Sequence, residues 1–166
     1  MALRFRVIAR LDIKGPNLIK GVRMEGLRVV GDPAEYARRY ARAGACELLY
    51  LDTVASLYGR NQLSGLLETT SRQAFIPITV GGGITSADEA QRLLNAGADM
   101  VAINTGAINN PDLIDKMSSR YGSQAITVSI AAQWREGWWE AMTECGRTHS
   151  GKDAVKWAEE AAGRGA

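Results

Sequence analysis

The chain has 166 residues, of which 46% are hydrophobic and 23% charged, and its formal net charge is +2. This composition is typical of one globular domain with a substantial core. The lysines and arginines are scattered along the chain, which argues against the basic face that a nucleic-acid-binding protein needs. No apolar stretch approaches the ~20 residues that span a bilayer, and the N-terminus lacks a signal-peptide pattern. We therefore expect a cytoplasmic protein without membrane contact.

Short β-branched runs alternate with longer amphipathic runs, a pattern that indicates repeated βα units around a parallel sheet. Strands are predicted over residues 5–11, 48–51, 76–80, 100–103 and 125–130. Helices are predicted over residues 32–43, 63–73, 86–96, 110–121 and 153–163. Capping patterns begin the first and third of these helices, Asp32 with Glu35 and Ser86 with Glu89.

Three segments fall outside this alternation. Residues 14–30 contain several glycines and are predicted to form a long loop. Residues 134–143 are predicted to form a β-hairpin that turns at Glu136 and Gly137. The single histidine, His149, is predicted to lie in a polar loop.

Residues that could bind a metal are few and do not have metal-ligand spacing. Cys46 and Cys145 lie in opposite halves of the chain and form no CxxC pair. We expect two reduced thiols rather than a disulfide or a zinc site. His149 has no cysteine or aspartate partner at metal-ligand spacing. The sequence therefore predicts neither a metal nor a cofactor.

Ligands of parallel α/β sheets bind at the carboxyl ends of the strands, so the residues that follow each predicted strand are the candidates. Asp12 ends the first strand, where a carboxylate could act as a general acid or base or could simply cap a loop. Gly82 and Gly83 belong to a triple glycine that either lets backbone N–H groups approach an anion or forms a tight turn. Asn104 and Thr105 add amide and hydroxyl donors at the next strand end, which favours a phosphate site.

Several of these segments, taken in order, carry a resemblance to a known family. They are Ala9-Arg10-Leu11-Asp12, Leu51-Asp52-Thr53, Val80-Gly81-Gly82-Gly83-Ile84, Ala96-Gly97-Ala98-Asp99 and Ile103-Asn104-Thr105. The chain resembles the cyclase subunits of imidazole glycerol phosphate synthase. The resemblance covers nearly the whole chain but only about the first two thirds of a family member.

The resemblance implies an α/β fold that is part of a TIM (β/α)8 barrel. Residues 1–166 are then expected to form a single truncated barrel domain with about five βα units and parallel strands. The implied reaction is the ammonia-dependent ring closure of a bis-phosphorylated aminoimidazole-carboxamide ribonucleotide in histidine biosynthesis. It also implies a glutaminase subunit as the partner that supplies ammonia.

Residue roles follow from the same resemblance. Family members use two aspartates as general acid and base, and Asp12 matches the first. Lys20 matches a flexible-loop lysine that handles substrate, and Asp52 matches a strand-end acid near the site. One of the two phosphate sites is matched by Gly82, Gly83, Asn104 and Thr105.

The chain departs from the family pattern at three places. Ala131 stands where the family has its second catalytic aspartate, and the loss of an acid–base partner typically lowers the rate ~10²–10⁴-fold. Met100 replaces a lysine of a charged ammonia gate to which Arg6 and Glu47 would belong. Arg10 replaces a small residue expected inside the barrel. We therefore expect impaired catalysis in this chain.

These departures leave a second hypothesis open, a non-catalytic phosphate-binding or self-assembling half-barrel module. An open sheet exposes the edges of its first and fifth strands, and such edges invite pairing with another chain. Side chains expected to face the open barrel interior are Val7, Leu49, Val101 and Val128. On this basis the sequence predicts a homo-oligomer.

Overall fold

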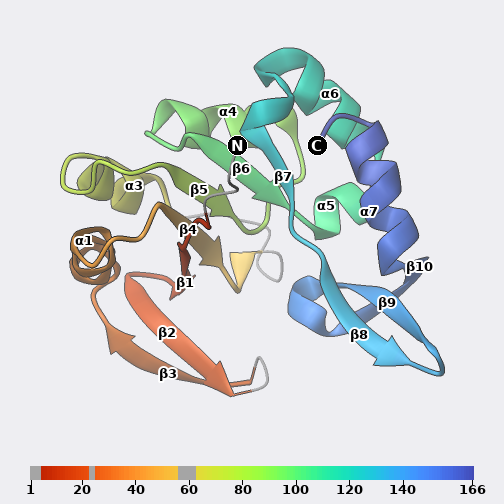
Figure 1. Ribbon diagram of the computed structural model, residues 1–166, viewed down its shortest axis with the longest axis horizontal. Coiled ribbons are helices and arrows are strands. Elements are labelled where there is room, and N and C mark those ends of the chain that lie inside the picture. Colours follow the sequence, from red (N-terminus) through yellow and green to blue (C-terminus); the bar gives the residue numbers. More distant parts are fainter. Residues whose placement is uncertain (1–4, 23–24, 56–62) are drawn as a thin grey trace.

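A computed structural model of the protein describes residues 5–22, 25–55 and 63–166. Within them, a seven-stranded sheet has the order β3-β2-β1-β4-β5-β6-β7, and a separate three-stranded sheet has the order β10-β9-β8. Helices lie along the outer face of the larger sheet, and the smaller sheet lies beyond the end of β7 (Figure 1). No helix in these residues is long and apolar enough to cross a membrane.

The predicted parallel strands form the centre of the larger sheet. Each neighbouring pair in this part of the sheet is parallel. The strands are β1 (Ile8–Lys14), β4 (Glu47–Asp52), β5 (Ile78–Gly81), β6 (Met100–Ile103) and β7 (Ile126–Val128). At least one helix lies between each of these strands and the next along the chain, as repeated βα units require. The predicted α/β fold of the (β/α)8-barrel type is confirmed.

The helices also follow the sequence prediction. They are α1 (Pro33–Arg42), α3 (Ser64–Ser71), α4 (Ala87–Asn95), α5 (Thr105–Asn109), α6 (Asp112–Tyr121) and α7 (Ala154–Gly163). At α4, Ser86 and Glu89 form the predicted capping box: the Glu89 amide donates to Ser86 Oγ, and the Ser86 amide donates to a Glu89 carboxylate oxygen. Asp32 caps α1 by accepting from the Glu35 amide at 2.8 Å. The short helix α5 was not predicted.

The loop predicted over residues 14–30 is instead a β-hairpin. Its strands β2 (Asn17–Val22) and β3 (Glu25–Gly31) add antiparallel strands to the sheet beside β1. Gly15 makes the tight turn with φ +57°, and Leu18 and Ile19 are buried. The glycines predict a loop, but two of them take positive-φ positions in antiparallel structure: Gly15 in the β1–β2 turn and Gly26 in β3.

The second predicted hairpin is confirmed. Glu136 and Gly137, both with positive φ, join β8 (Ala131–Arg135) to β9 (Trp138–Thr143) in a two-residue turn. A further strand, β10 (Thr148–Asp153), pairs with β9 in the region predicted as a loop. His149 lies in this strand, where its ring contacts Glu140 at 2.9 Å.

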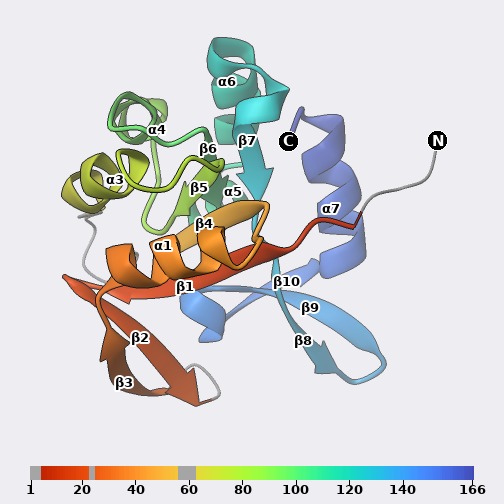
Figure 2. The ribbon, with the colours of Figure 1, turned by 60° about the vertical axis from the view of Figure 1, so that its left-hand side comes forward.

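The core lies between the larger sheet and its helices. Tyr50 of β4 is fully buried there and shares a 3.0 Å hydrogen bond with Thr70 of α3, and burial raises the pKa of Tyr50 to about 12. Val101 is buried in the same core, which corrects its predicted exposure on the open interior face. Nor is β1 an edge strand, because β2 pairs with its carboxyl-terminal half. Figure 2 shows this hairpin continuing the sheet below β1.

Candidate active site

The carboxyl ends of the parallel strands meet at one level of the sheet. Asp12 of β1 pairs with Leu51 of β4, Leu51 pairs with Gly81 of β5, and Gly81 pairs with Ala102 of β6. Residues just beyond this level therefore share one rim. The rim brings together Asp12, the triple glycine and the end of β6 that carries Asn104, as the sequence predicted.

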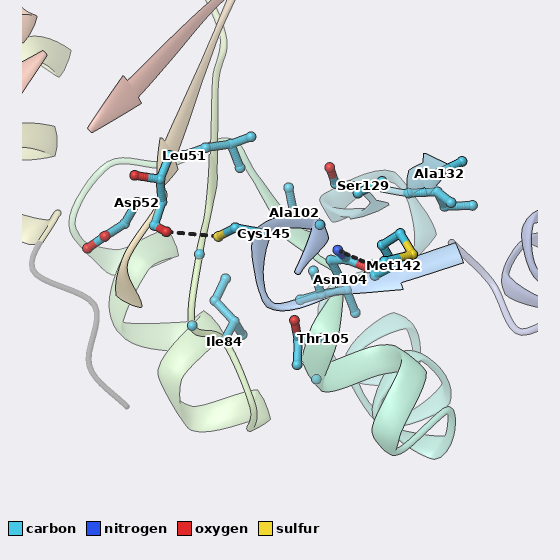
Figure 3. A pocket seen from close by; sticks show the side chains of 18 of the residues that line it. Leu51, Asp52, Ile84, Ala102, Asn104, Thr105, Ser129, Ala132, Met142 and Cys145 are labelled. Carbon is cyan, nitrogen blue, oxygen red and sulfur yellow. Dashed lines mark hydrogen bonds between the residues drawn. The ribbon is translucent and has the colours of Figure 1, made fainter. Parts of the chain in front are cut away.

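A cavity of about 460 Å³ opens at this rim (Figure 3). Most of the predicted site residues line it, and these are Asp52, Gly82, Gly83, Asn104 and Thr105. Its wall also includes residues of the β7–β8 segment, of β9 and of the Glu144–Gly146 turn, which close the side that faces the smaller sheet. The volume falls within the range of small-molecule sites.

The triple glycine is required by close packing at the strand end. Gly82 and Gly83 have φ of +109° and +66°, in the region that favours glycine. A Cβ atom on Gly83 would lie 2.7 Å from the Cβ of Ala55, and one on Gly82 would collide with the Asp52 carbonyl. Close packing thus requires glycine at both positions. The same turn places the Gly82 and Gly83 backbone in the cavity wall.

Asn104 and Thr105 fix the smaller sheet against the end of β6. The Asn104 amide nitrogen donates to the Met142 carbonyl at 3.0 Å, and Thr105 Oγ1 accepts from the Glu144 amide at 3.0 Å. Cys145 adds a contact of its thiol with the Thr53 carbonyl at 2.8 Å. The Asn104 carbonyl oxygen is buried and has no hydrogen-bond partner among the described residues. It is therefore available to accept from a ligand.

Asp12 lies beside this cavity rather than in its wall. It lines a small neighbouring pocket with Thr53, Cys145 and Arg147, among others. Its Oδ1 accepts from Arg10 Nε at 2.8 Å, and Arg10 does line the larger cavity. Arg10 therefore joins Asp12 to the wall of the larger cavity, and Thr53 and Cys145 line both pockets.

The remaining predicted residues lie at different depths. Asp52 is buried at the end of β4, where Oδ1 accepts from the Val54 amide at 3.1 Å. Lys20 is exposed on β2 and lines neither pocket. Ala131, which stands in place of the family aspartate, lines the larger cavity and carries no ionisable group. In the described part of the chain, no cluster of His, Cys, Asp and Glu could hold a metal ion.

Sequence reasoning missed the contribution of the smaller sheet to the site. Met142 and Cys145 line the cavity although they lie far along the chain from the triple glycine. Such contacts depend on how β9 folds back onto β6, for which the sequence gives no local signal. Arg10 did carry a signal, because it precedes Asp12 by two positions and so lies on the same face of β1.

Comparison with known proteins assigns the family. The model of a family described as histidine biosynthesis protein matches residues 6–166. A protein of Legionella pneumophila, imidazole glycerol phosphate synthase subunit HisF, is 62% identical over 154 residues, which are 92% of this chain and 73% of that protein. The chain belongs to the histidine biosynthesis protein family.

This histidine biosynthesis family member has a second polar group at the opposite end of its strands. Glu47, at the start of β4, is buried and accepts from Thr79 Oγ1 at 2.6 Å. Arg6 lies 4.0 Å from the same carboxylate. Met100 begins β6 nearby in the sheet, paired with Thr79. Asp99, just before Met100, adds a further carboxylate at this end of the strands and accepts from the Ile78 amide at 2.8 Å.

Proposed function

We propose that the chain is a cyclase of the imidazole glycerol phosphate synthase type, acting on a bis-phosphorylated aminoimidazole-carboxamide ribonucleotide with ammonia. The observation that carries the proposal is the shared rim, where Asp12, the triple glycine and Asn104 meet beside a substrate-sized cavity. The 62% identity to a HisF subunit supports the same activity.

In this proposal the rim binds a phosphate and Asp12 moves a proton. The residues Gly82, Gly83, Asn104 and Thr105 line the cavity, where backbone N–H groups, the second N–H of the Asn104 amide and the Thr105 hydroxyl supply donors for a phosphate. Asp12 is the general acid or base at the adjoining pocket. We assign substrate handling to Lys20 on the β2–β3 hairpin and an accessory acidic role to Asp52.

Ammonia enters, in this proposal, from the other end of the strands, where a glutaminase subunit docks. The Glu47 carboxylate, with Arg6 at 4.0 Å, is the charged group that ammonia or ammonium meets first. Met100 carries no charge, so the gate is incomplete compared with the family pattern. We expect ammonium salts to support turnover better than glutamine plus a glutaminase.

Because Ala131 carries no carboxylate, restoring one there tests the proposed cyclase activity directly. Turnover of the ribonucleotide with ammonium salts is expected to be slow for the wild-type chain, to fall to background in Asp12→Asn, and to rise ~10²–10⁴-fold in Ala131→Asp. A rate that Asp12→Asn leaves unchanged would overturn the proposal. So would the lack of turnover in both the wild type and Ala131→Asp.

A second candidate function, a self-assembling phosphate-binding module, is favoured by specific observations. Ala131 can transfer no proton, and Phe5 and Val7, just before β1, are exposed together with Ile8 at its start. Phosphate binding without turnover in either the wild type or Ala131→Asp would support this function. In that case the cavity serves ligand binding and the exposed apolar residues serve association.

A further inference from the structure

Arg10 occupies a position that none of the roles above explains. It lies on β1, two residues before Asp12 and therefore on the same face of the strand, and it pairs in register with Leu49. Its side chain is about half exposed (47%) and lines the larger cavity. Arg10 is therefore placed where a bound molecule would touch it.

The ion pair with Asp12 uses only part of the guanidinium group. Nε donates to Asp12 Oδ1 at 2.8 Å. No hydrogen bond joins the terminal nitrogens, Nη1 and Nη2, to another described residue. A guanidinium fork that is fixed at Nε and open at both terminal nitrogens can bind two oxygens of a phosphate at once.

The carboxylates in and beside the cavity also mean that an anionic ligand needs a cationic side chain to bind there. Among the described residues that line it, Arg10 and Asp52 carry the formal charges, and Asp12 adds a carboxylate next door. Arg147 also lines that neighbouring pocket. A phosphorylated ligand in the larger cavity would thus meet two carboxylates, with Arg10 as the one cation among the described residues that line the larger cavity itself. Backbone and hydroxyl donors orient a phosphate, but they do not offset this negative charge.

We propose that Arg10 is the side chain that binds the anionic group of the ligand, with Asp12 holding Nε and both terminal nitrogens donating to phosphate oxygens. This role of Arg10 rests on the proposed function in one respect, namely that the ligand carries a phosphate group. It makes Asp12 a group that orients Arg10 in addition to any proton transfer. It also accounts for a long cationic side chain at a position expected to hold a small residue.

Binding of inorganic phosphate, measured by NMR titration of the intact chain, tests the proposal without any turnover. Arg10→Ala should weaken phosphate binding about 10–100-fold, the range of a charge-assisted hydrogen-bonded contact. Arg10→Lys keeps the charge but not the guanidinium fork, so its affinity for phosphate should lie between those of the wild type and Arg10→Ala. Arg38→Ala is the matched control, because Arg38 is an exposed arginine of α1 that does not line the cavity.

A double-mutant cycle separates direct binding from an effect through Asp12. Asp12→Asn removes the competing negative charge but keeps a side-chain oxygen that can accept from Arg10 Nε, so phosphate binding should stay unchanged or tighten. Arg10→Ala in the Asp12→Asn background should weaken binding as much as it does alone. If the loss vanishes in that background, or if Arg10→Ala binds phosphate like the wild type, Arg10 does not contact the ligand and the proposal is wrong.

The two proposals fail in distinguishable ways. Lost phosphate affinity in Arg10→Ala, together with no turnover in the wild type and Ala131→Asp, would keep Arg10 as the anion-binding residue and reject the cyclase. Normal turnover with unchanged phosphate affinity in Arg10→Ala would keep the cyclase and reject the role of Arg10.

Discussion

At the scale of single residues, the site depends on backbone positions as much as on side chains. Gly83 shows this, since it has positive φ and its Cα lies against Ala55. Gly65, at the start of α3, has ordinary helical surroundings and no atom within 4 Å of an added Cβ. The same substitution should therefore have opposite effects at the two positions.

Gly83→Ala should lower the free energy of unfolding by about 1–3 kcal/mol, because the new methyl group strains the backbone and meets Ala55 at 2.7 Å. Gly65→Ala should raise it by roughly 0.5–1 kcal/mol, because alanine loses less backbone entropy in a helix. Urea denaturation of both variants measures the difference. Equal stability of the two variants would contradict the close packing at the triple glycine.

At the scale of elements, one buried carboxylate on the central strand of the smaller sheet contacts both neighbouring strands. Glu140 on β9 is 1% exposed and accepts from the Gly151 amide at 2.8 Å. His149 Nδ1 lies 2.9 Å and Arg135 Nη1 3.2 Å from its other oxygen. The bonds from Gly151, His149 and Arg135 outweigh desolvation and hold the pKa of Glu140 below its ordinary value of 4.5.

This lowered pKa makes the stability of the smaller sheet pH-dependent. The ionised carboxylate stabilises the folded state above the ordinary pKa of 4.5, and this contribution is lost as pH falls through the lower folded-state pKa. Glu140→Gln should lower the melting temperature by several degrees at pH 7, and the gap to the wild type should narrow below pH 4.5. Thermal melts at a series of pH values test this.

Glu159→Gln is the matched control for this measurement, since Glu159 is exposed on α7. It removes the same charge without removing the buried hydrogen bonds. A pH-independent gap between Glu140→Gln and the wild type would contradict the assigned role of the ionised carboxylate.

At the scale of the whole molecule, a short segment near the start of the described chain exposes three apolar side chains. Phe5 is 100% exposed, Val7 64% and Ile8 45%; the first two lie just before β1 and Ile8 begins it. One edge of this segment is already paired with the residues that precede β4, since the Cys46 amide donates to the Val7 carbonyl at 2.8 Å. The other side of this segment, with its apolar side chains, is suited to a second copy of the chain.

We therefore predict self-association at micromolar concentration, and light scattering measures it. Val7→Lys should shift the population toward monomer, because it places a charge in the apolar contact. Val155→Lys is the matched control, since Val155 is an exposed valine (59%) on α7, outside this cluster. A monodisperse wild-type monomer, or equal effects of the two lysine variants, would show that β1 is not the contact.

The sequence by itself determined the parallel strands, most helices and the rim that joins Asp12, Gly82, Gly83 and Asn104. These features depend on local periodicity, on caps such as Ser86 with Glu89, and on the rule that parallel strands end at one edge. The catalytic role of Asp12 and the phosphate-binding role of the glycines remain predictions.

Only the tertiary structure decided which of these residues share a cavity and what closes it. Two strand pairings, β2 with β1 and β10 with β9, involve segments that lack a distinct local sequence pattern. The contacts of Met142 with the end of β6 and of Cys145 with the end of β4 join segments that are distant in sequence. The hydrogen bond between Arg10 and Asp12 is also decided by the tertiary structure. Strand alternation predicts that the two side chains lie on one face of β1, but it does not predict the 2.8 Å contact between them. Such contacts depend on the packing of the complete fold, which local propensities do not encode.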